Sequence, residues 1–116
     1  MLSCLMIADD FTGACDTGMQ FARFGLRSVV VIDPAQVRGR AEGPQVLVVD
    51  TKSRNCSRGD AARRVREACD PLLYLTPRLV YKKIDSALRG NLATEIRTTM
   101  QAFGMDLCLM ACLRFR

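Results

Sequence analysis

The side chains best suited to bind a ligand lie in three short polar segments. The first, "ADDFTGACD", contains Asp9, Asp10, Thr12 and Asp16 within eight positions. Clustered carboxylates repel one another, so they need a compensating partner, and they can accept hydrogen bonds from the hydroxyl groups of a ligand. The structural alternative is that Asp10 or Thr12 caps a helix, with the other acids close to its positive end.

The second segment, "DTKSR", and the third, "KKIDSALRGN", add cations. Arg54 and Arg89 could each bind a carboxylate through two parallel hydrogen bonds, and Gly90 would let a ligand approach the backbone. An ordinary turn and a capped helix with a surface arginine are the alternatives. The candidate binding residues of these two segments are Ser53, Arg54, Lys83, Asp85, Ser86, Arg89, Gly90 and Asn91.

Together the segments predict a site for a small ligand that is both anionic and rich in hydroxyl groups. The cations would bind the acid group of the ligand, and the aspartates would accept hydrogen bonds from its hydroxyls.

Apolar residue patterns predict strands that alternate with helices along the chain, and these elements position the three segments. Strands are expected over 2–8, 27–33, 45–50, 78–84 and 106–112, and helices over 13–25, 57–73 and 91–103. Such alternation indicates one α/β domain over 1–116, with a three-layer, mostly parallel, five-stranded Rossmann-like sheet and helices on both faces. The three polar segments follow the first, third and fourth strands, and ligands bind beyond the carboxyl ends of parallel strands.

Local signals refine two of the helices. Ser57 and Asp60 resemble a capping box, and Asn91 is expected to cap the last helix. That helix would carry Leu92, Ile96, Met100 and Phe103 on one side.

Composition narrows the class of protein. The chain has 116 residues, of which 49% are hydrophobic, and a net charge of +5, which favours anionic partners in general. Six cysteines occur without a Cys-x-x-Cys pair or any histidine, so no metal site is expected, and reduced cysteines indicate the cytoplasm. No apolar run is long enough to span a bilayer, and no membrane partner is expected.

Two other classes of protein share some of these features. A receiver-like phosphoacceptor signalling domain shares the size, the acid pair and an aspartate, Asp50, at the end of the third strand. Its loop after Asp50 would normally contain proline and glycine, whereas this chain has "TKSRNCS". Nucleic acid is not an expected partner, because the basic run "ARRVR" has no interleaved aromatic residues.

The segments "IADDFTGACDTGMQFARFGL", "VVDTKSR" and "YKKIDSALRGNLATEI" closely resemble the N-terminal domain of the four-carbon acid sugar kinases. The resemblance implies an α/β sugar-acid-binding domain of D-threonate, D-erythronate or 3-oxo-tetronate kinases. It also implies a C-terminal domain that binds ATP with Mg²⁺. By this resemblance Asp9, Asp10, Thr12, Asp16, Ser53, Arg54, Lys83, Asp85, Ser86, Arg89, Gly90 and Asn91 form the site. A general base must reach the attacking hydroxyl, and we expect Asp10 first and Asp85 second.

The sequence departs from the family at its end. After the fifth expected strand the family continues into the nucleotide domain, whereas this chain ends "ACLRFR". Neither G-x-x-x-x-G-K-[ST] nor G-x-G-x-x-G occurs, so the chain has no nucleotide site of its own. We therefore expect a truncated substrate-binding part that is inactive alone and that could associate with a separately encoded nucleotide-binding half.

Overall fold

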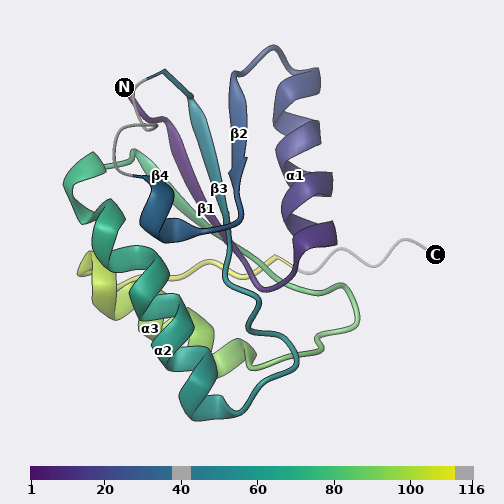
Figure 1. The fold of residues 1–116 in the computed structure, drawn as a ribbon, viewed down its shortest axis with the longest axis vertical. Helices are drawn as coiled ribbons and strands as arrows, with labels where there is room; N and C mark the ends of the chain where they lie inside the picture. The colour runs from purple at the N-terminus through teal and green to yellow at the C-terminus, as the bar shows by residue number, and fades with distance from the viewer. Residues whose placement is uncertain (38–42, 112–116) are drawn as a thin grey trace.

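The sheet of this protein consists of four parallel strands. A computed structural model describes residues 1–37 and 43–111. The strands are β1 (Cys4–Ala8), β2 (Ser28–Val31), β3 (Val46–Asp50) and β4 (Leu79–Lys83). Their order is β2-β3-β1-β4, so the first strand of the chain lies inside the sheet, between β3 and β4 (Figure 1).

Three α-helices connect and cover these strands. They are α1 (Phe11–Arg23), α2 (Arg58–Cys69) and α3 (Leu92–Phe103), and two 3₁₀ helices, η1 (Pro34–Val37) and η2 (Asp70–Leu75), lie between them along the chain. The expected helix over 57–73 divides into α2 and η2. Pro71 explains the division, because it has no N–H to donate to the carbonyl four residues earlier.

The side chains of β1 alternate between two packed faces. Met6 packs with Ala14 of α1 in one apolar cluster, whereas Ile7 packs with Val65 of α2 in the other. All five residues of β1 and all five of β3 are buried, as expected for strands inside a parallel sheet. Figure 1 shows α1 on one side of the sheet and α2 and α3 on the other.

The expected fifth strand is wrong. Residues 106–111 form no strand, and residue 112 of the predicted range lies outside the described residues. Leu107 is 76% exposed and Leu109 is 90% exposed. An apolar segment becomes a strand when one of its faces is buried. No described element covers this segment, and β4 remains the edge of the sheet.

Helix α3 buries polar residues rather than those of its apolar side. Leu92, Ile96, Met100 and Phe103 are only partly buried, and the buried residues of this helix are Glu95, Thr98 and Thr99. Thr98 and Thr99 satisfy their hydroxyls by donating to the carbonyls of Thr94 and Glu95. Helix α3 therefore presents a polar stripe to the protein interior, which an apolar periodicity does not reveal.

None of the described helices is long and apolar enough to cross a membrane.

Candidate functional site

Arg54 joins the three polar segments at one edge of the sheet. Its Nε donates to Asp9 Oδ2 at 3.1 Å and its Nη2 to Asp9 Oδ1 at 3.0 Å. The same Nη2 lies 3.0 Å from Asp10 Oδ1, and Nη1 lies 3.6 Å from Asp85 Oδ1. The three carboxylates thus share one guanidinium, and this contact with Asp9 is the main reason that the pKa of Arg54 is raised.

The turn after β3 places Arg54 beside the end of β1. The backbone N–H groups of Ser53 and Arg54 both donate to the carbonyl of Asp9, at 3.0 and 3.2 Å. The hydroxyl of Thr51 donates to the carbonyl of Ala8 at 2.9 Å and lies 2.6 Å from Ser53 Oγ. These bonds continue the pairing of β1 with β3 beyond the strands, so the position of Arg54 is tied to that of Asp9.

Asp10 caps α1 and also contacts Arg54. Its Oδ1 accepts from the backbone N–H of Gly13 at 3.0 Å, so the capping role that the sequence left open as the structural alternative is present at Asp10. A Cβ atom at position 13 would lie 2.6 Å from that same oxygen, so any other residue there would displace the capping carboxylate. The side chain of Asp10 is 28% exposed, and Oδ2 takes part in none of these contacts.

Asp85 forms the second ion pair of the site. Arg89 donates to it from Nε at 2.8 Å and from Nη2 at 2.9 Å, while the backbone N–H groups of Ala87 and Arg89 donate to Oδ2. These bonds, with that from the Arg89 side chain first, hold the pKa of Asp85 well below its usual range. Asp85 is buried, whereas the side chain of Arg89 is 68% exposed and lies at the surface.

Gly90 and Asn91 bring the third segment against the second. Gly90 has φ +97°, and a Cβ atom there would lie 3.0 Å from Asp9 Oδ2 and 3.7 Å from the Cα of Arg54. Asn91 lies at the N-cap position of α3 but makes no side-chain cap bond. The expected capping role is therefore wrong. The amide of Asn91 instead donates to the carbonyls of Ser53 and Cys56.

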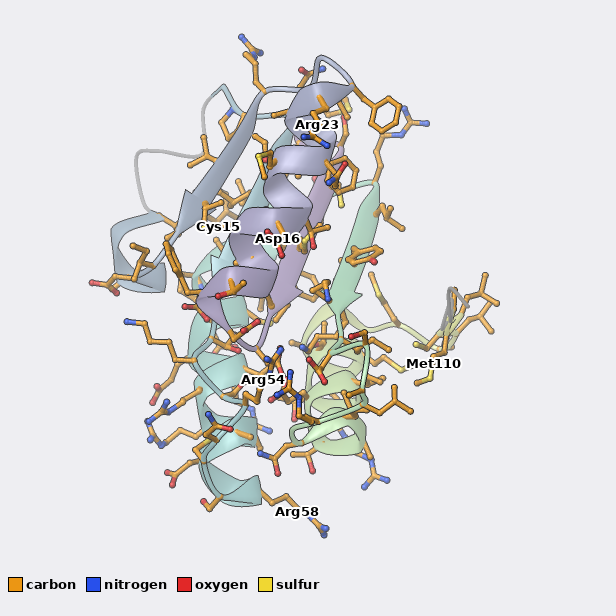
Figure 2. All side chains as sticks on the ribbon, turned by 90° about the vertical axis from the view of Figure 1, so that its right-hand side faces the viewer. Cys15, Asp16, Arg23, Arg54, Arg58 and Met110 are labelled. Atoms are coloured by element: carbon orange, nitrogen blue, oxygen red, sulfur yellow. The ribbon has the colours of Figure 1, made fainter. Side chains whose placement is uncertain are left out.

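The remaining predicted residues lie less centrally. Thr12, Asp16 and Ser86 are exposed, and Figure 2 shows Asp16 on α1 well above Arg54. The hydroxyl of Ser53 is buried against Thr51. Lys83 is half-buried, and its Nζ donates to the carbonyl of Ile84 at 2.6 Å. The structure thus unites Asp9, Asp10, Arg54, Asp85 and Arg89 and leaves Asp16 outside this group.

Sequence reasoning did not assign Asp50 to the site. Its carboxylate is 2% exposed, Oδ1 accepts from the N–H of Lys52 at 2.9 Å, and Oδ2 has no hydrogen-bond partner among the described residues. Burial is the first cause that raises the pKa of Asp50, and the charges of Asp10 and Asp9 add to it. The sequence signal that could have assigned Asp50 to the site is its place at the carboxyl end of β3.

The cavities of the described structure border this site only in part. A groove of about 710 Å³ between α2 and α3 is lined by Gly90 and Asn91. A second cavity, of about 380 Å³, lies against β4, α3 and residues 105–111 and includes none of the five charged residues that the site unites. Within residues 1–37 and 43–111 no group of acidic, cysteine or histidine side chains is arranged to hold a metal ion.

Comparison with known proteins identifies the family of this chain. The model of a family described as "Sugar-binding N-terminal domain" matches residues 4–115. The chain is 42% identical over 108 residues to a D-threonate kinase of Salmonella typhimurium, covering 92% of this chain and 25% of that enzyme. It is 38% identical over 110 residues to a D-erythronate kinase of Heliobacterium modesticaldum, covering 91% and 24%.

A solved structure is similar as well. The crystal structure of a domain of unknown function from Bordetella bronchiseptica, a domain-swapped dimer with bound citrate, superimposes with a TM-score of 0.78 at 34% identity. The match covers 85% of this chain and 25% of that one. The present chain therefore spans about a quarter of the length of its curated relatives.

Proposed function

Because this chain belongs to the family of sugar-binding N-terminal domains, we propose that it binds a four-carbon sugar acid as the substrate-binding part of an ATP-dependent kinase. The substrate class is that of threonate, erythronate and 3-oxo-tetronate. Kinase relatives that act on D-threonate and D-erythronate support this class. The receiver-like alternative finds no support in these matches.

One observation carries the proposal: an exposed arginine and an array of ordered carboxylates lie at the same edge of the sheet. Arg89 projects from the buried Asp85, and Arg54 holds Asp9 and Asp10 beside it. A sugar acid has a carboxylate at one end and hydroxyl groups along its length. Arginine binds the first and aspartate accepts from the second, so the chemistry of the ligand matches that of the site.

The contacts suggest different roles for the cations. Arg54 is only 15% exposed and donates to Asp9 and Asp10, so we assign to it the positioning of these acids. Arg89 and Lys83 remain for the carboxylate of the substrate, because Arg89 is largely exposed and Lys83 pairs with no described acid.

The two candidate bases differ in their contacts. Both oxygens of Asp85 accept hydrogen bonds from Arg89, which stabilises the ionised carboxylate and makes it a weak base. Asp10 uses Oδ1 for Gly13 and Arg54 and keeps Oδ2 free of these bonds, on a partly exposed side chain. We therefore propose Asp10 as the group that takes the proton of the attacking hydroxyl.

Kinase relatives imply ATP and Mg²⁺ for the full enzyme. The described residues do not fit this pair, because Asp9, Asp10 and Asp85 are bound to arginines and no metal-holding group occurs among them. Apart from the proton that Asp10 would accept, we assign no step of phosphoryl transfer to this chain, and we expect no turnover of ATP by it alone. A nucleotide-binding partner, separately encoded, would supply that step in our proposal. A reducing cytoplasm would suit its five described cysteines, which are all free.

Isothermal titration of the 116-residue chain with D-threonate and D-erythronate tests this function. Butanoate supplies a carboxylate without hydroxyls, and threitol supplies hydroxyls without a carboxylate. We expect saturable heat from the sugar acids and at least about tenfold weaker binding of the other two. Arg89→Ala should remove binding, and Arg23→Ala is the matched control because Arg23 is exposed, forms no described ion pair and lies at the far end of α1 from Arg54 (Figure 2).

Equal binding of butanoate and D-threonate, or no binding of either acid by the folded chain, would reject the proposal. Turnover of ATP by the chain alone in the presence of D-threonate would reject the division between a substrate-binding part and a nucleotide-binding partner.

A further inference from the structure

Lys82 of β4 and Glu95 of α3 form an ion pair inside the protein. Lys82 Nζ lies 2.9 Å from Glu95 Oε2, and the two side chains are 8% and 0% exposed. The same Nζ donates to the carbonyl of Lys83 at 2.9 Å, while Glu95 Oε1 has no hydrogen-bond partner among the described residues. A buried ion pair is a poor source of stability, because removing both charges from water offsets their attraction. Its presence calls for another role.

The pair links the two elements that flank the third polar segment. Lys82 is the first residue of this segment and lies on β4, and Glu95 lies in the first turn of α3, which follows the segment. Between them lie Asp85, Arg89 and Gly90. The distance between Lys82 and Glu95 therefore determines how far apart the two ends of this segment are held.

The segment itself adopts a backbone that needs support. Leu88 has φ +58°, which a side-chain-bearing residue adopts at a cost, and Gly90 has φ +97°. Within the segment, Asp85 accepts from the N–H groups of Ala87 and Arg89. These local bonds shape the turn. The amide of Asn91, which donates to the carbonyls of Ser53 and Cys56, and the contact of Asp85 with Arg54 hold the segment against the second one, while β4 and α3 hold its two ends.

We propose that the Lys82–Glu95 ion pair is a positioning device, which fixes the start of α3 against the end of β4 and thereby places Asp85 and Arg89 in the binding site. Its link to substrate rests on the proposed function. Separating the two charges would leave each of them buried without its partner, which is costly, whereas an apolar contact of the same volume imposes no such penalty when the two elements shift. Neither residue touches the substrate in this proposal, and each acts through the segment between them.

The test replaces both charges together in the 116-residue chain. Lys82→Met with Glu95→Leu removes one positive and one negative charge and fills a similar volume. The net charge of the protein is therefore unchanged, and the fold should persist. The readout is the pKa of Asp85, followed by the NMR shift of its carboxyl carbon as pH is lowered. Val65→Ala is the control. It removes apolar packing that Val65 of α2 makes in the core, and it leaves the charges of β4 and α3 unchanged.

We expect the pKa of Asp85 to move up by about one pH unit in the double variant, since Arg89 is no longer held over it. The control should lose stability and leave this pKa unchanged. Should the double variant not fold, Glu95→Gln is used instead, because it keeps the shape of the side chain. We expect the same upward shift of the Asp85 pKa in that variant. An unchanged Asp85 pKa in either folded variant overturns the proposal.

A second readout concerns the ligand. The affinity for D-threonate should fall about tenfold in the double variant and remain unchanged in Val65→Ala. If the wild-type chain binds no sugar acid, the proposed function fails, while the titration of Asp85 still decides the positioning role.

Discussion

Arg54 and Asp9 form a bidentate pair in which both carboxylate oxygens of Asp9 accept hydrogen bonds, and the Asp9 side chain is 1% exposed. The pair joins two segments that lie 45 positions apart along the chain. A carboxylate buried to this degree depends on its cation, so the pair links the order of the site to the stability of the fold.

Replacing Arg54 should therefore destabilise the protein strongly. Arg54→Met leaves Asp9 buried without its cation, and we expect the free energy of unfolding to fall by about 3–5 kcal/mol. Urea unfolding followed by circular dichroism at pH 7 measures the change. Arg58→Met is the matched control, since Arg58 is exposed at the start of α2 and should change stability by less than about 0.5 kcal/mol (Figure 2). Similar curves for the two variants would contradict the assignment.

Gly90 and Gly59 should respond in opposite directions to alanine. Gly90 has φ +97°, and an added Cβ would lie 3.0 Å from Asp9 Oδ2, so Gly90→Ala should cost about 1–3 kcal/mol. Gly59 lies in α2 with open space around it, so Gly59→Ala should stabilise by about 0.4–1 kcal/mol. Thermal unfolding of both variants at one protein concentration compares them. A stabilised Gly90→Ala would show that the close approach is not required.

The Asp85–Arg89 pair predicts a specific loss of stability in acid. Because the pKa of Asp85 is lowered in the folded state, its contribution is complete above the unfolded pKa of about 3.9 and is lost as pH falls through that value and below it. The free energy of unfolding should fall less steeply between pH 5 and 3 in Arg89→Ala than in the wild type. Arg97→Ala should keep the wild-type slope. Salt should reduce the difference, since Arg89 is exposed.

Asp50 predicts the opposite dependence. Its pKa is raised in the folded state, so the wild type loses stability through this group as pH rises through about 3.9 towards the folded pKa. Asp50→Asn keeps an oxygen for the N–H of Lys52 and has no charge to bury. The variant should gain stability relative to the wild type between pH 3 and 7 in urea unfolding. A constant difference across this range would exclude ionisation of Asp50 as the cause.

The cysteines should separate by reactivity. Burial raises the pKa of Cys69 to about 12, and Cys4 is buried as well, whereas Cys108 is exposed. Iodoacetamide at pH 8 should therefore label Cys108 at least about tenfold faster than the two buried thiols, with tandem mass spectrometry assigning each site. In 6 M urea all should react alike. Rapid native labelling of Cys69 would contradict its burial.

Much of the sheet and the location of the site follow from the sequence pattern. The apolar runs before Asp9, Asp50 and Asp85 predict buried parallel strands, and the carboxyl ends of such strands lie at one edge. For this reason three segments far apart in the sequence could be expected together. The run "DLCLMAC" is equally apolar, yet its described part forms no strand, since no described element covers it. The apolar pattern of a segment does not reveal whether another element will cover it.

The partners of individual charges could not be predicted in this way. Whether Arg54 faces a ligand or Asp9 depends on the turn that Thr51 and Ser53 form, and their hydrogen bonds are not visible in composition or periodicity. Glu95 was missed for a similar reason. A glutamate within a helix is normally assigned to the solvent side, and its burial follows only from the position of Lys82 across the interface.

The strand order also has a consequence for how this chain acquires its structure. Cys4 pairs with Val46 on one side and with Leu79 on the other, so β1 gains its second neighbour only after β4 has been synthesised, more than 70 positions later in the chain. Until Leu79–Lys83 has been synthesised, the fully apolar β1 lacks a neighbour on one side, and contacts so distant in sequence form slowly. During translation this segment remains open to aggregation, and the nascent chain should therefore depend on chaperones for longer than one whose first strand pairs with the second.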